Sequence, residues 1–445
     1  MGLATFKGGV HPYEGKELSE NKPVQVLMPK GDLVFPMSQG IGAPANPLVK
    51  KGDRVLAGQI IGEAGGFISA NVICSVSGTV KAVEPRRVAS GGMVNSVVVE
   101  NDGLYEAVEG MGADRDPSTL SKQEIRDIVK AAGIVGMGGA GFPTNVKLSP
   151  KNEDAIEYIL INGAECEPYL TSDYRCMMED PEKIIGGLKV VLQLFDKAKG
   201  VIGIENNKPE AIKKLKELVK DEPRIEVCEL LTKYPQGGER SLIYAVTGRS
   251  VNSSMLPADA GCIVDNIATV IAIYDAVCKT TPLIERVFTV TGDAIADPRN
   301  FRIKIGTNTQ ELIEAAGGFK SEPEKVISGG PMMGFAMFDL DVPVIKTNGS
   351  VLCMTKDQVA ASVETPCIRC GKCVSACPSH IVPVMMMKAA LKGDCDTFEK
   401  LNGMECMECG SCTFVCPAKR PLTQAFKEMR KTVAANRRKK AQGGK

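Results

Sequence analysis

Between residues 24 and 100 the chain alternates short runs of β-branched and apolar residues with glycine turns. The turns stand at residues 49–53, 58–62 and 75–80, so the apolar runs between them are short. Short runs closed by glycine are typical of strands joined by tight turns. The pattern predicts an all-β unit that follows a turn-rich arm at residues 1–30.

A different pattern begins at residue 116. Residues 116–132 have the apolar spacing of a helix, with Ser118 or Ser121 as its N-cap. Beyond them strand-like and helix-like segments alternate: strands at 155–162, 199–205 and 224–231, and helices at 181–195, 209–220 and 238–246. This alternation predicts a parallel sheet with helices packed on it, and the ligands of such sheets gather at loops beyond the carboxyl ends of the strands.

The last third of the chain changes character twice. The β-prone segment 286–292, a short helix at 309–316 and a methionine-rich glycine turn at 328–334 predict a small α+β unit whose turn packs against a neighbour. Residues 384–391 then favour a helix inside a region rich in cysteine. At 445 residues the chain is too long for one core, and about three domains or more are expected.

Charge and composition exclude some classes of function. The 54 Lys and Arg residues balance 53 Asp and Glu, so no overall field recruits nucleic acid. Residues 1–10 lack the apolar core of a signal peptide, and the apolar stretch 262–278 carries two aspartates and is too short to cross a membrane. We therefore expect a cytoplasmic chain. The tail at 427–445, with eight Lys or Arg residues, is expected to be a solvated, disordered end or an electrostatic tether to an anionic membrane.

The cysteines carry the strongest chemical signal. Residues 367–378 and 406–417 both have the pattern C-x-x-C-x-x-C-x-x-x-C-P, in which three thiolates hold one [4Fe-4S] cluster and the fourth reaches a neighbouring cluster. We therefore expect two clusters in a helical ferredoxin-like unit. The crossed pattern gives Cys367, Cys370, Cys373 and Cys416 to one cluster, and Cys406, Cys409, Cys412 and Cys377 to the other.

Zinc sites or disulfides are the alternatives for these cysteines. Paired zinc ligands rarely come as four cysteines in so short a run, and neither alternative explains the proline after each last cysteine. The remaining cysteines lack framework spacing and are expected to be buried or inert thiols: Cys74, Cys166, Cys176, Cys228, Cys262, Cys278, Cys353 and Cys395. A two-cluster relay carries single electrons, so another group has to supply them.

A glycine-dense loop at residues 136–144 precedes Lys147. Its N–H groups can approach a phosphate or a flat ring closely, and the lysine can supply a positive charge. The loop is neither a Walker loop nor a dinucleotide fingerprint, so a tight turn is the alternative. Two more loops at the expected sheet edge, 162–168 and 234–240, carry polar groups, although composition alone slightly favours a solvated surface pair for Glu165 and Glu167. His11 has no partner nearby and is given no site role.

Gly-Gly-Ala-Gly-Phe-Pro-Thr with a lysine shortly after it resembles the FMN and NADH loop of the flavoprotein subunit of respiratory complex I. Segments 162–168, 237–239 and 266–269 resemble that family's Asn-x-x-Glu-x-Glu-Pro, Gly-Glu-Glu and Asn-x-x-Thr segments. The resemblance implies FMN binding by Gly136, Gly138, Gly139, Lys147, Asn162, Asn266 and Thr269, and places Ala140, Gly141, Phe142, Glu167 and Gly237 with them among the cofactor-binding residues. It also implies catalytic roles for Glu165 and Glu239 in the cleft where nicotinamide stacks on the flavin. Met137, Ala164 and Gly238 depart from the family pattern, where an arginine, an aspartate and a glutamate stand.

The N-terminal β-rich segment resembles the barrel-sandwich fold of lipoyl and biotinyl carrier domains, without their carrier-lysine turn. Together with the Gly-Gly-Val-His-Pro arm and the cysteine groups, the order of motifs from about residue 5 to 425 resembles the C subunit of the Rnf electron-transport complex. The resemblance implies a peripheral subunit on the cytoplasmic face of the cell membrane. It would exchange electrons between NAD(H), non-covalent FMN and two [4Fe-4S] clusters, with ferredoxin-like and membrane subunits of an ion-translocating ferredoxin:NAD oxidoreductase as partners.

These expectations divide the chain into a multidomain α/β protein. Its parts are an arm at 1–30, an all-β barrel-sandwich domain at 31–112, an FMN- and NADH-binding α/β domain at 113–281, a β-grasp-like SLBB-type module at 282–352, a helical two-cluster ferredoxin domain at 353–426 and the basic tail at 427–445.

Two rival functions remain open. A cobalamin reductase of the propanediol-utilisation type shares the glycine loop and the cysteine groups, but its glycine loop lies near the amino terminus and Gly136 does not. An iron–sulfur relay or scaffold protein without NADH activity would fit the departures at Met137, Ala164 and Gly238. A hydrolase is disfavoured, because only His11 and His380 could serve as a histidine base.

Overall fold

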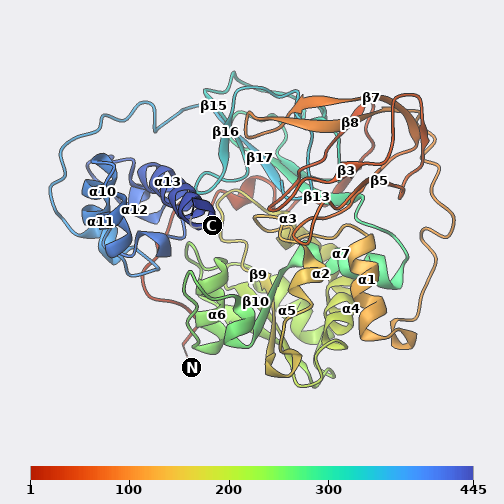
Figure 1. Cartoon of the computed structure of the whole chain (residues 1–445), viewed down its shortest axis with the longest axis horizontal. Coiled ribbons are helices and arrows are strands. Elements are labelled where there is room, and N and C mark those ends of the chain that lie inside the picture. Colours follow the sequence, from red (N-terminus) through yellow and green to blue (C-terminus); the bar gives the residue numbers. More distant parts are fainter. Residues whose placement is uncertain (1, 444–445) are drawn as a thin grey trace.

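The computed structural model describes residues 2–443. It contains a central α/β unit, two β-rich units that lie together on one side of it, and a helical unit that carries the paired cysteines on another side (Figure 1). We call these the central unit, the barrel-sandwich unit, the mixed-sheet unit and the cysteine unit. The chain is therefore multidomain and contains a parallel sheet, as predicted.

The central unit is built on a four-stranded sheet in the order β11-β10-β9-β12, in which every pairing is parallel. Its strands are β9 (Tyr158–Gly163), β10 (Lys199–Glu205), β11 (Ile225–Leu230) and β12 (Cys262–Asn266). Its helices are α1 (Lys122–Ala131), α2 (Thr144–Lys147), α3 (Ser172–Glu179), α4 (Pro181–Leu192), α5 (Pro209–Leu218), α6 (Glu239–Thr247) and α7 (Ile267–Cys278). The largest apolar core of the described residues lies between this sheet and its helices.

Local signals explain most of these boundaries. Helix α1 begins after Ser121, whose hydroxyl accepts from the Glu124 N–H while the Glu124 carboxylate accepts from the Ser121 N–H, which is a capping box. The predicted helix at 116–132 therefore starts later than expected, because Asp116 caps a separate 3-10 turn, η2 (Pro117–Thr119). Helices α3 and α7 and strand β12 were not predicted.

The barrel-sandwich unit consists of two antiparallel sheets that enclose an apolar core including Leu33, Phe35 and Val97. One sheet contains β2 (Leu33–Pro36), β8 (Met93–Asn101), β7 (Gly78–Arg87) and β4 (Arg54–Val55). The other contains β3 (Asn46–Pro47), β5 (Ile60–Glu63) and β6 (Val72–Ile73).

The mixed-sheet unit has six strands in the order β1-β14-β13-β17-β15-β16. They are β1 (Gln25–Leu27), β13 (Glu285–Thr291), β14 (Arg299–Lys304), β15 (Lys325–Ser328), β16 (Phe335–Met337) and β17 (Ser350–Met354), and α8 (Thr309–Ala315) packs on them. Strand β1 comes from the N-terminal arm and pairs in parallel with β14. The arm is thus built into the fold and also forms η1 (Lys16–Leu18).

The cysteine unit is helical: α9 (Lys372–Ser375), α10 (Pro383–Leu391), α11 (Cys395–Lys400), α12 (Ser411–Phe414) and α13 (Leu422–Gly443). Helices α9 and α12 each follow a glycine in the left-handed region, Gly371 and Gly410, which reflects the repeated motif. The expectation of a disordered tail is wrong for residues 427–443, because α13 continues through them while Phe426 and Val433 pack into the unit. Residues 444 and 445 of the predicted tail lie outside the described residues.

Three 3-10 turns complete the elements: η3 (Glu153–Ala155), η4 (Pro257–Ala260) and η5 (Gly403–Glu405). No helix among residues 2–443 is both long enough and apolar enough to cross a membrane.

Candidate functional site

The carboxyl ends of the central strands bring the predicted loops together. Asn162 on β9 and Asn266 on β12 are direct partners in the parallel register, so the two amide side chains stand at the same level of the sheet edge. The glycine loop reaches the same edge, because the N–H of Met137 donates to the Thr269 hydroxyl at 2.9 Å. We call this sheet edge with its loops the cleft.

The glycine loop is closed at its base, where the Gly136 N–H donates to the Phe142 carbonyl at 2.9 Å. At its tip, the N–H groups of Gly138 and Gly139 donate to no acceptor within residues 2–443. A Cβ at Gly138 would lie 3.0 Å from the Cβ of Asn266, whereas a Cβ at Gly139 would meet nothing within 4 Å. Gly138 is thus tightly packed against Asn266, and Gly139 faces open space where a ligand can lie against the backbone.

The outer side of this loop rests on the barrel-sandwich unit. The Ile41 N–H donates to the Ala140 carbonyl at 2.8 Å, and Gly141 packs against Gly40. The buried amine of Lys346 ties the same region together, because it donates to the carbonyls of Asn71 and Gly133. Burial lowers the pKa of Lys346 to about 7.

Lys147 lies below the loop and is already paired. Its amine donates to the Val264 carbonyl at 2.7 Å and to Asp265 Oδ1 at 2.9 Å. Oδ2 of Asp265 is buried and has no partner among the described residues. Burial raises the pKa of the Glu239 carboxyl, an effect that Lys147 opposes and Asp265 reinforces. The cleft floor therefore holds the Lys147–Asp265 pair, with the Glu239 carboxyl close enough to be affected by both groups.

The polar loops at 162–168 and 234–240 are hydrogen-bonded to each other. Asn162 Nδ2 donates to the Gly237 carbonyl at 2.7 Å, and the Gly237 N–H donates to the thiol sulfur of Cys166 at 3.2 Å. Residues of both predicted segments therefore form one wall of the cleft. Cys166 has a structural contact here that its sequence context did not predict.

Glu165 and Glu167 are not a solvated surface pair. The Glu165 carboxylate accepts from the N–H groups of Asp173 at 2.6 Å and Tyr174 at 3.2 Å, at the start of α3. Glu167 Oε1 accepts from the N–H of Met332 at 2.6 Å and thereby holds the methionine-rich turn of the mixed-sheet unit. Burial raises the pKa of both carboxyl groups. Glu167 thus joins two units, and its predicted role in cofactor binding stays a prediction.

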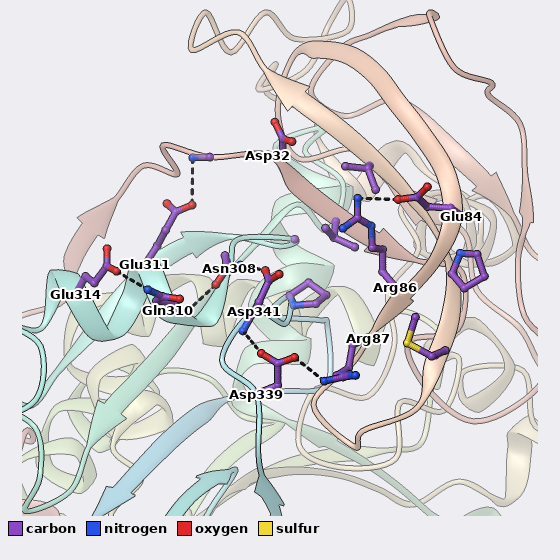
Figure 2. A pocket seen from close by; sticks show the side chains of 17 residues that line it. Asp32, Glu84, Arg86, Arg87, Asn308, Gln310, Glu311, Glu314, Asp339 and Asp341 are labelled. Carbon is purple, nitrogen blue, oxygen red and sulfur yellow. Dashed lines mark hydrogen bonds and ion pairs between the residues drawn. The ribbon is translucent and has the colours of Figure 1, made fainter. Parts of the chain in front are cut away.

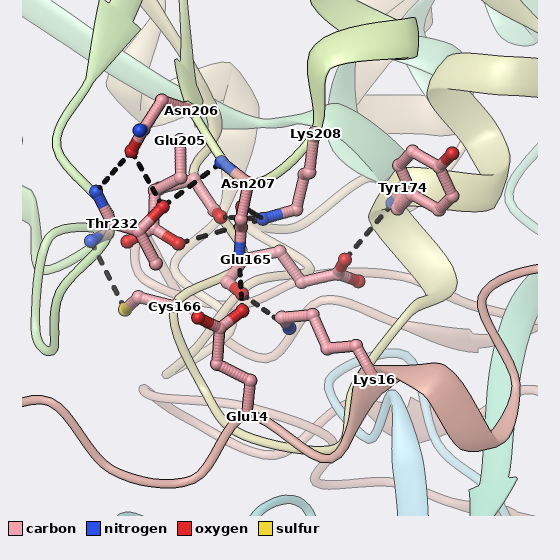
Figure 3. A network of polar contacts seen from close by, with 12 residues as sticks. Glu14, Lys16, Glu165, Cys166, Tyr174, Glu205, Asn206, Asn207, Lys208 and Thr232 are labelled. Atoms are coloured by element: carbon pink, nitrogen blue, oxygen red, sulfur yellow. Dashed lines mark hydrogen bonds and ion pairs between the residues drawn. The ribbon is translucent and has the colours of Figure 1, made fainter.

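Sequence reasoning missed the cations that hold this loop (Figure 3). The amine of Lys16, from the N-terminal arm, donates to the carbonyls of Glu165 at 2.8 Å and Leu170 at 2.7 Å. The buried amine of Lys208 donates to the Ala164 carbonyl at 2.7 Å and lies 3.6 Å from Glu205 Oε2. These contacts surround Glu165, whose φ of 46° is in the left-handed region.

Asp173 was also missed. Its Oδ2 accepts from Asn266 Nδ2 at 2.6 Å, so it orients an amide that the sequence assigned to FMN. Burial raises the pKa of the Asp173 carboxyl. No local motif marks Asp173 or Lys16, since each acquires its partner only when separate segments fold together.

The cysteines separate into two environments. Cys377, Cys406, Cys409 and Cys412 line one small cavity, closed by Phe426 and Thr423. Cys367 and Cys370 are exposed, and Cys373 and Cys416 are partly buried. No three His, Cys, Asp or Glu side chains in the described part of the chain lie close enough to hold a single metal ion. A cubane carries iron at four corners and takes its four thiolates at a wider spacing, which suits the cavity.

The cavity lies against the cleft. A Cβ at Gly238, beside Glu239, would stand 2.9 Å from Cε of Met407, which lies between two cavity cysteines. Glu405 accepts from Arg240 at 3.0 Å and from the Ser253 N–H at 2.8 Å. Gly238, where the complex I pattern has a glutamate, is thus closely packed: a side chain there would press on the Met407 methyl and on the Pro235 carbonyl.

The arm completes this contact. The Gly9 N–H donates to the Ala376 carbonyl at 2.9 Å, and a Cβ at Gly8 would lie 2.9 Å from the Cys377 carbonyl. Both glycines have positive φ, 86° and 84°. Gly8 and Gly9 of the arm thus pack directly against the backbone at Ala376 and Cys377, a cysteine of the cavity.

A cavity of about 700 Å³ lies elsewhere, between the barrel-sandwich and mixed-sheet units (Figure 2). Most of its polar side chains are paired with one another: Arg86 with Glu84, Arg87 with Asp339, Asn308 with Asp341, and Gln310 with Glu314. It contains none of the residues predicted for FMN or the clusters, and we assign it no function.

Family profiles match four segments of the chain. They are the RnfC barrel sandwich hybrid domain at residues 4–104, the Nuo51 FMN-binding domain at 129–275, the SLBB domain at 287–336 and a 4Fe-4S dicluster domain at 366–419. The cofactors expected from the sequence, FMN and two [4Fe-4S] clusters, are those of the matched domains.

Relatives match nearly the whole chain. It is 45% identical over 445 residues to the C subunit of the proton-translocating ferredoxin:NAD(+) oxidoreductase complex of Clostridium ljungdahlii, covering 99% of this chain and 96% of the relative. It is 46% identical over 444 residues to the C subunit of the Na(+)-translocating ferredoxin:NAD(+) oxidoreductase complex of Acetobacterium woodii, covering 98% of both. The C subunit of the ion-translocating oxidoreductase complex of Pseudomonas aeruginosa is 39% identical and is covered over 57% of its length.

Among solved structures, the chain resembles a crystal structure of an NAD+-reducing [NiFe]-hydrogenase in the H2-reduced state. The TM-score is 0.51 at 19% identity, covering 71% of this chain and 61% of that chain. This likeness is one of fold.

Proposed function

The chain belongs to the family of C subunits of Rnf-type ion-translocating ferredoxin:NAD(+) oxidoreductase complexes, and we propose that it couples NAD(H) at the cleft to a one-electron relay through its cysteine unit. The relatives that match over nearly their full length are C subunits of ferredoxin:NAD(+) oxidoreductase complexes, which supports this function over the cobalamin reductase alternative. The chain is accordingly an oxidoreductase subunit that works with the other subunits of its complex.

The single observation that carries the proposal is the contact between cleft and cavity. Gly238 of the cleft wall lies against Met407 of the four-cysteine cavity, while Cys367 and Cys370 of the other group face solvent. Electron transfer falls steeply with distance. We therefore infer that electrons pass from the cleft to the cavity formed by Cys377, Cys406, Cys409 and Cys412, then to the exposed group, and from there to a partner.

FMN, when bound, accepts a hydride from NADH and gives up electrons singly, which matches a dinucleotide to iron–sulfur acceptors. Several features fit its binding. The N–H groups of Gly138 and Gly139 are unpaired within residues 2–443, Gly139 faces open space, and the buried Oδ2 of Asp265 lacks a partner among the same residues. We propose that these N–H groups and Lys147 hold the flavin nucleotide, with Asn162, Asn266 and Thr269 orienting it.

Glu165 and Glu239 line the side from which the dinucleotide would enter. Burial raises the pKa of both carboxyl groups, which reduces negative charge where a diphosphate approaches. We propose that Lys16 and Lys208 keep the Glu165 backbone in its left-handed conformation, so that the carboxyl stays directed toward α3.

The finer architecture also belongs to this proposal. We propose that the mixed-sheet unit is a β-grasp module, which the SLBB match at 287–336 supports. We also propose the domain limits given above, and attachment to the cytoplasmic face of the membrane through the other proteins of the complex. The exposed basic residues at the end of α13, including Arg438, Lys439 and Lys440, would favour an anionic surface there.

The test is a cofactor and reduction assay on the chain purified without oxygen. The proposal expects FMN, iron and labile sulfide together, and NADH that bleaches the flavin absorbance before the cluster absorbance. Clusters without flavin would favour a relay protein, and flavin without NADH-driven bleaching would exclude the proposed electron entry.

A further inference from the structure

The buried hydroxyl of Tyr234 lacks a hydrogen-bond partner. The side chain is only 1% exposed, and its oxygen has no partner within residues 2–443. An unpaired buried hydroxyl costs on the order of 1–3 kcal/mol, so nearly all such groups are satisfied in native proteins. This position needs an acceptor.

The surroundings of the ring point to the cysteine cavity. Tyr234 lies in an apolar cluster with Val10, Ala376 and the cavity ligand Cys409, and Cys166 and Met332 pack against that cluster. Nearby groups on Glu167, Cys166 and Cys409 reinforce the effect of burial in raising the pKa of the Tyr234 hydroxyl. The oxygen is therefore near a cluster ligand and away from solvent.

Two hydrogen bonds fix the backbone of Tyr234 to the arm, and the buried ring is held by packing. The Tyr234 N–H donates to the Val10 carbonyl at 2.9 Å, and the Val10 N–H donates to the Tyr234 carbonyl at 2.8 Å. Glu167 Oε1 already accepts from the N–H groups of the methionine-rich turn, and Cys166 accepts from the Gly237 N–H. Neither Glu167 nor Cys166 makes a hydrogen bond to the Tyr234 hydroxyl, so Glu167 Oε2 is the competing acceptor that the test has to separate from the cluster.

We propose that the Tyr234 hydroxyl donates a hydrogen bond to the [4Fe-4S] group held by Cys377, Cys406, Cys409 and Cys412, at the Cys409 sulfur or an inorganic sulfide beside it. The inference rests on the cofactors of the proposed function. A hydrogen bond to a cluster sulfur stabilises the more negative, reduced state and so raises the reduction potential.

The other contacts to these sulfurs come from within the cysteine unit: the Glu408 N–H at Cys406, Ser411 at Cys409 and Thr423 at Cys412. Tyr234 belongs to the central unit, in the loop that leads to Gly237 and Glu239. Its hydroxyl therefore makes the potential of the nearer cluster depend on the docking of the two units. Separation of the units would make that cluster a poorer acceptor.

The test is Tyr234→Phe in the full chain, which removes only the hydroxyl. We expect unchanged FMN, iron and sulfide contents. In an EPR-monitored redox titration, the equilibrium constant for reducing one cluster should fall roughly tenfold, a shift of about 59 mV to more negative potential, while the other cluster keeps its potential. Tyr244→Phe, at an exposed tyrosine of α6, is the matched control and should shift neither.

A second measurement does not depend on a variant. Wild-type protein containing tyrosine labelled with ¹⁷O at the hydroxyl should show an ¹⁷O coupling to one reduced cluster in electron–nuclear double resonance. Absence of that coupling, or equal potentials in Tyr234→Phe and wild type, would overturn the proposal and leave Glu167 as the acceptor. NADH bleaching of the flavin in the same samples separates this failure from failure of the proposed function.

Discussion

The amine of Lys16 donates a hydrogen bond of 2.8 Å to the carbonyl oxygen of Glu165, across 149 positions of the chain. It also donates to the carbonyls of Glu167 and Leu170, so one arm residue closes the whole loop. The N-terminal arm is therefore part of the cleft, and it reaches the cysteine unit through Gly8 and Gly9 as well.

Replacing Lys16 by methionine should loosen this loop. Three carbonyl oxygens lose their donor, and each unpaired buried acceptor costs on the order of 1–3 kcal/mol. We expect the rate of flavin bleaching by NADH, measured by stopped-flow absorbance, to fall roughly tenfold if about 1.4 kcal/mol of positioning is lost. Lys7→Met, at an exposed arm lysine, should keep the wild-type rate. Equal rates for both variants would remove Lys16 from the proposal.

Whether an element could be predicted depends on how far apart in the sequence the residues that determine it lie. Strand β10 and helix α5 were predicted nearly to the residue, because their apolar spacing and the proline that begins α5 are local. Helix α7 has apolar residues on nearly all sides and β12 runs directly into it, so neither showed a distinct period. Strand β1 depends on a partner strand far along the chain.

The same distinction holds at the site. The roles of Asn162 and Asn266 at the sheet edge were predictable from motifs, but the amine of Lys208 and the carboxyl of Asp173 meet the cleft only through tertiary packing. Glu167 was assigned to cofactor binding by resemblance, and its contact with Met332 requires the mixed-sheet unit to be in place. Motifs identify chemistry, whereas the supporting contacts come from the fold.

Glu205 should make stability depend on pH. Burial raises the pKa of its carboxyl to about 7, although Lys208 and Lys16 oppose the shift. Between the ordinary carboxyl pKa of about 4.3 and 7, the folded state keeps a proton that the unfolded state releases, so stability falls as pH rises through this window. The loss is at most about 1.4 kcal/mol per pH unit. Calorimetry of Glu205→Gln should show a smaller fall in melting temperature between pH 5 and 7.

The control for this prediction is Glu226→Gln, at an exposed carboxyl on the neighbouring strand β11. It should reproduce the wild-type dependence on pH. A Glu205→Gln curve parallel to wild type would show that Glu205 is already ionised in the folded protein at pH 5.

Gly139→Asp should release FMN without disturbing the fold. A Cβ at this position meets no protein atom within 4 Å, so any loss must come from the ligand, whose phosphate a carboxylate would repel. Acid precipitation of the purified variant should release little flavin into the supernatant, while its iron and sulfide contents stay at wild-type levels. Gly92→Asp, in the turn between β7 and β8, has similar free space and should keep its flavin. Full flavin content in Gly139→Asp would move the site away from this loop.

Cys370→Ser should remove one cluster and spare the other. Wild type is expected to contain about eight iron atoms and eight labile sulfides, as two cubanes require. Cys370 is exposed and lies apart from the four-cysteine cavity, so its replacement should lower both contents by about half and leave one EPR signal of the reduced protein. Cys228→Ser, outside both groups, should change neither content. Stoichiometric zinc without sulfide in wild type would contradict the assignment.

The order of electron flow can be tested by removing one cofactor at a time. The cleft and the cysteine unit have separate cores, so either cofactor set can be lost while the other remains in place. In a Cys373→Ala, Cys412→Ala double variant, NADH should still bleach the flavin, but transfer to a ferredoxin-like partner should stop. In Gly139→Asp, dithionite should reduce the clusters and NADH should not. Cys409→Ser gives the most direct test. Its cavity lies against the cleft wall and is the proposed first acceptor, so NADH should reduce neither cluster in that variant, whereas in Cys370→Ser it should still reduce the inner one. Rapid NADH reduction of the exposed cluster in Cys409→Ser would reverse the proposed order, since electrons would then have reached the surface without passing the cavity beside Tyr234.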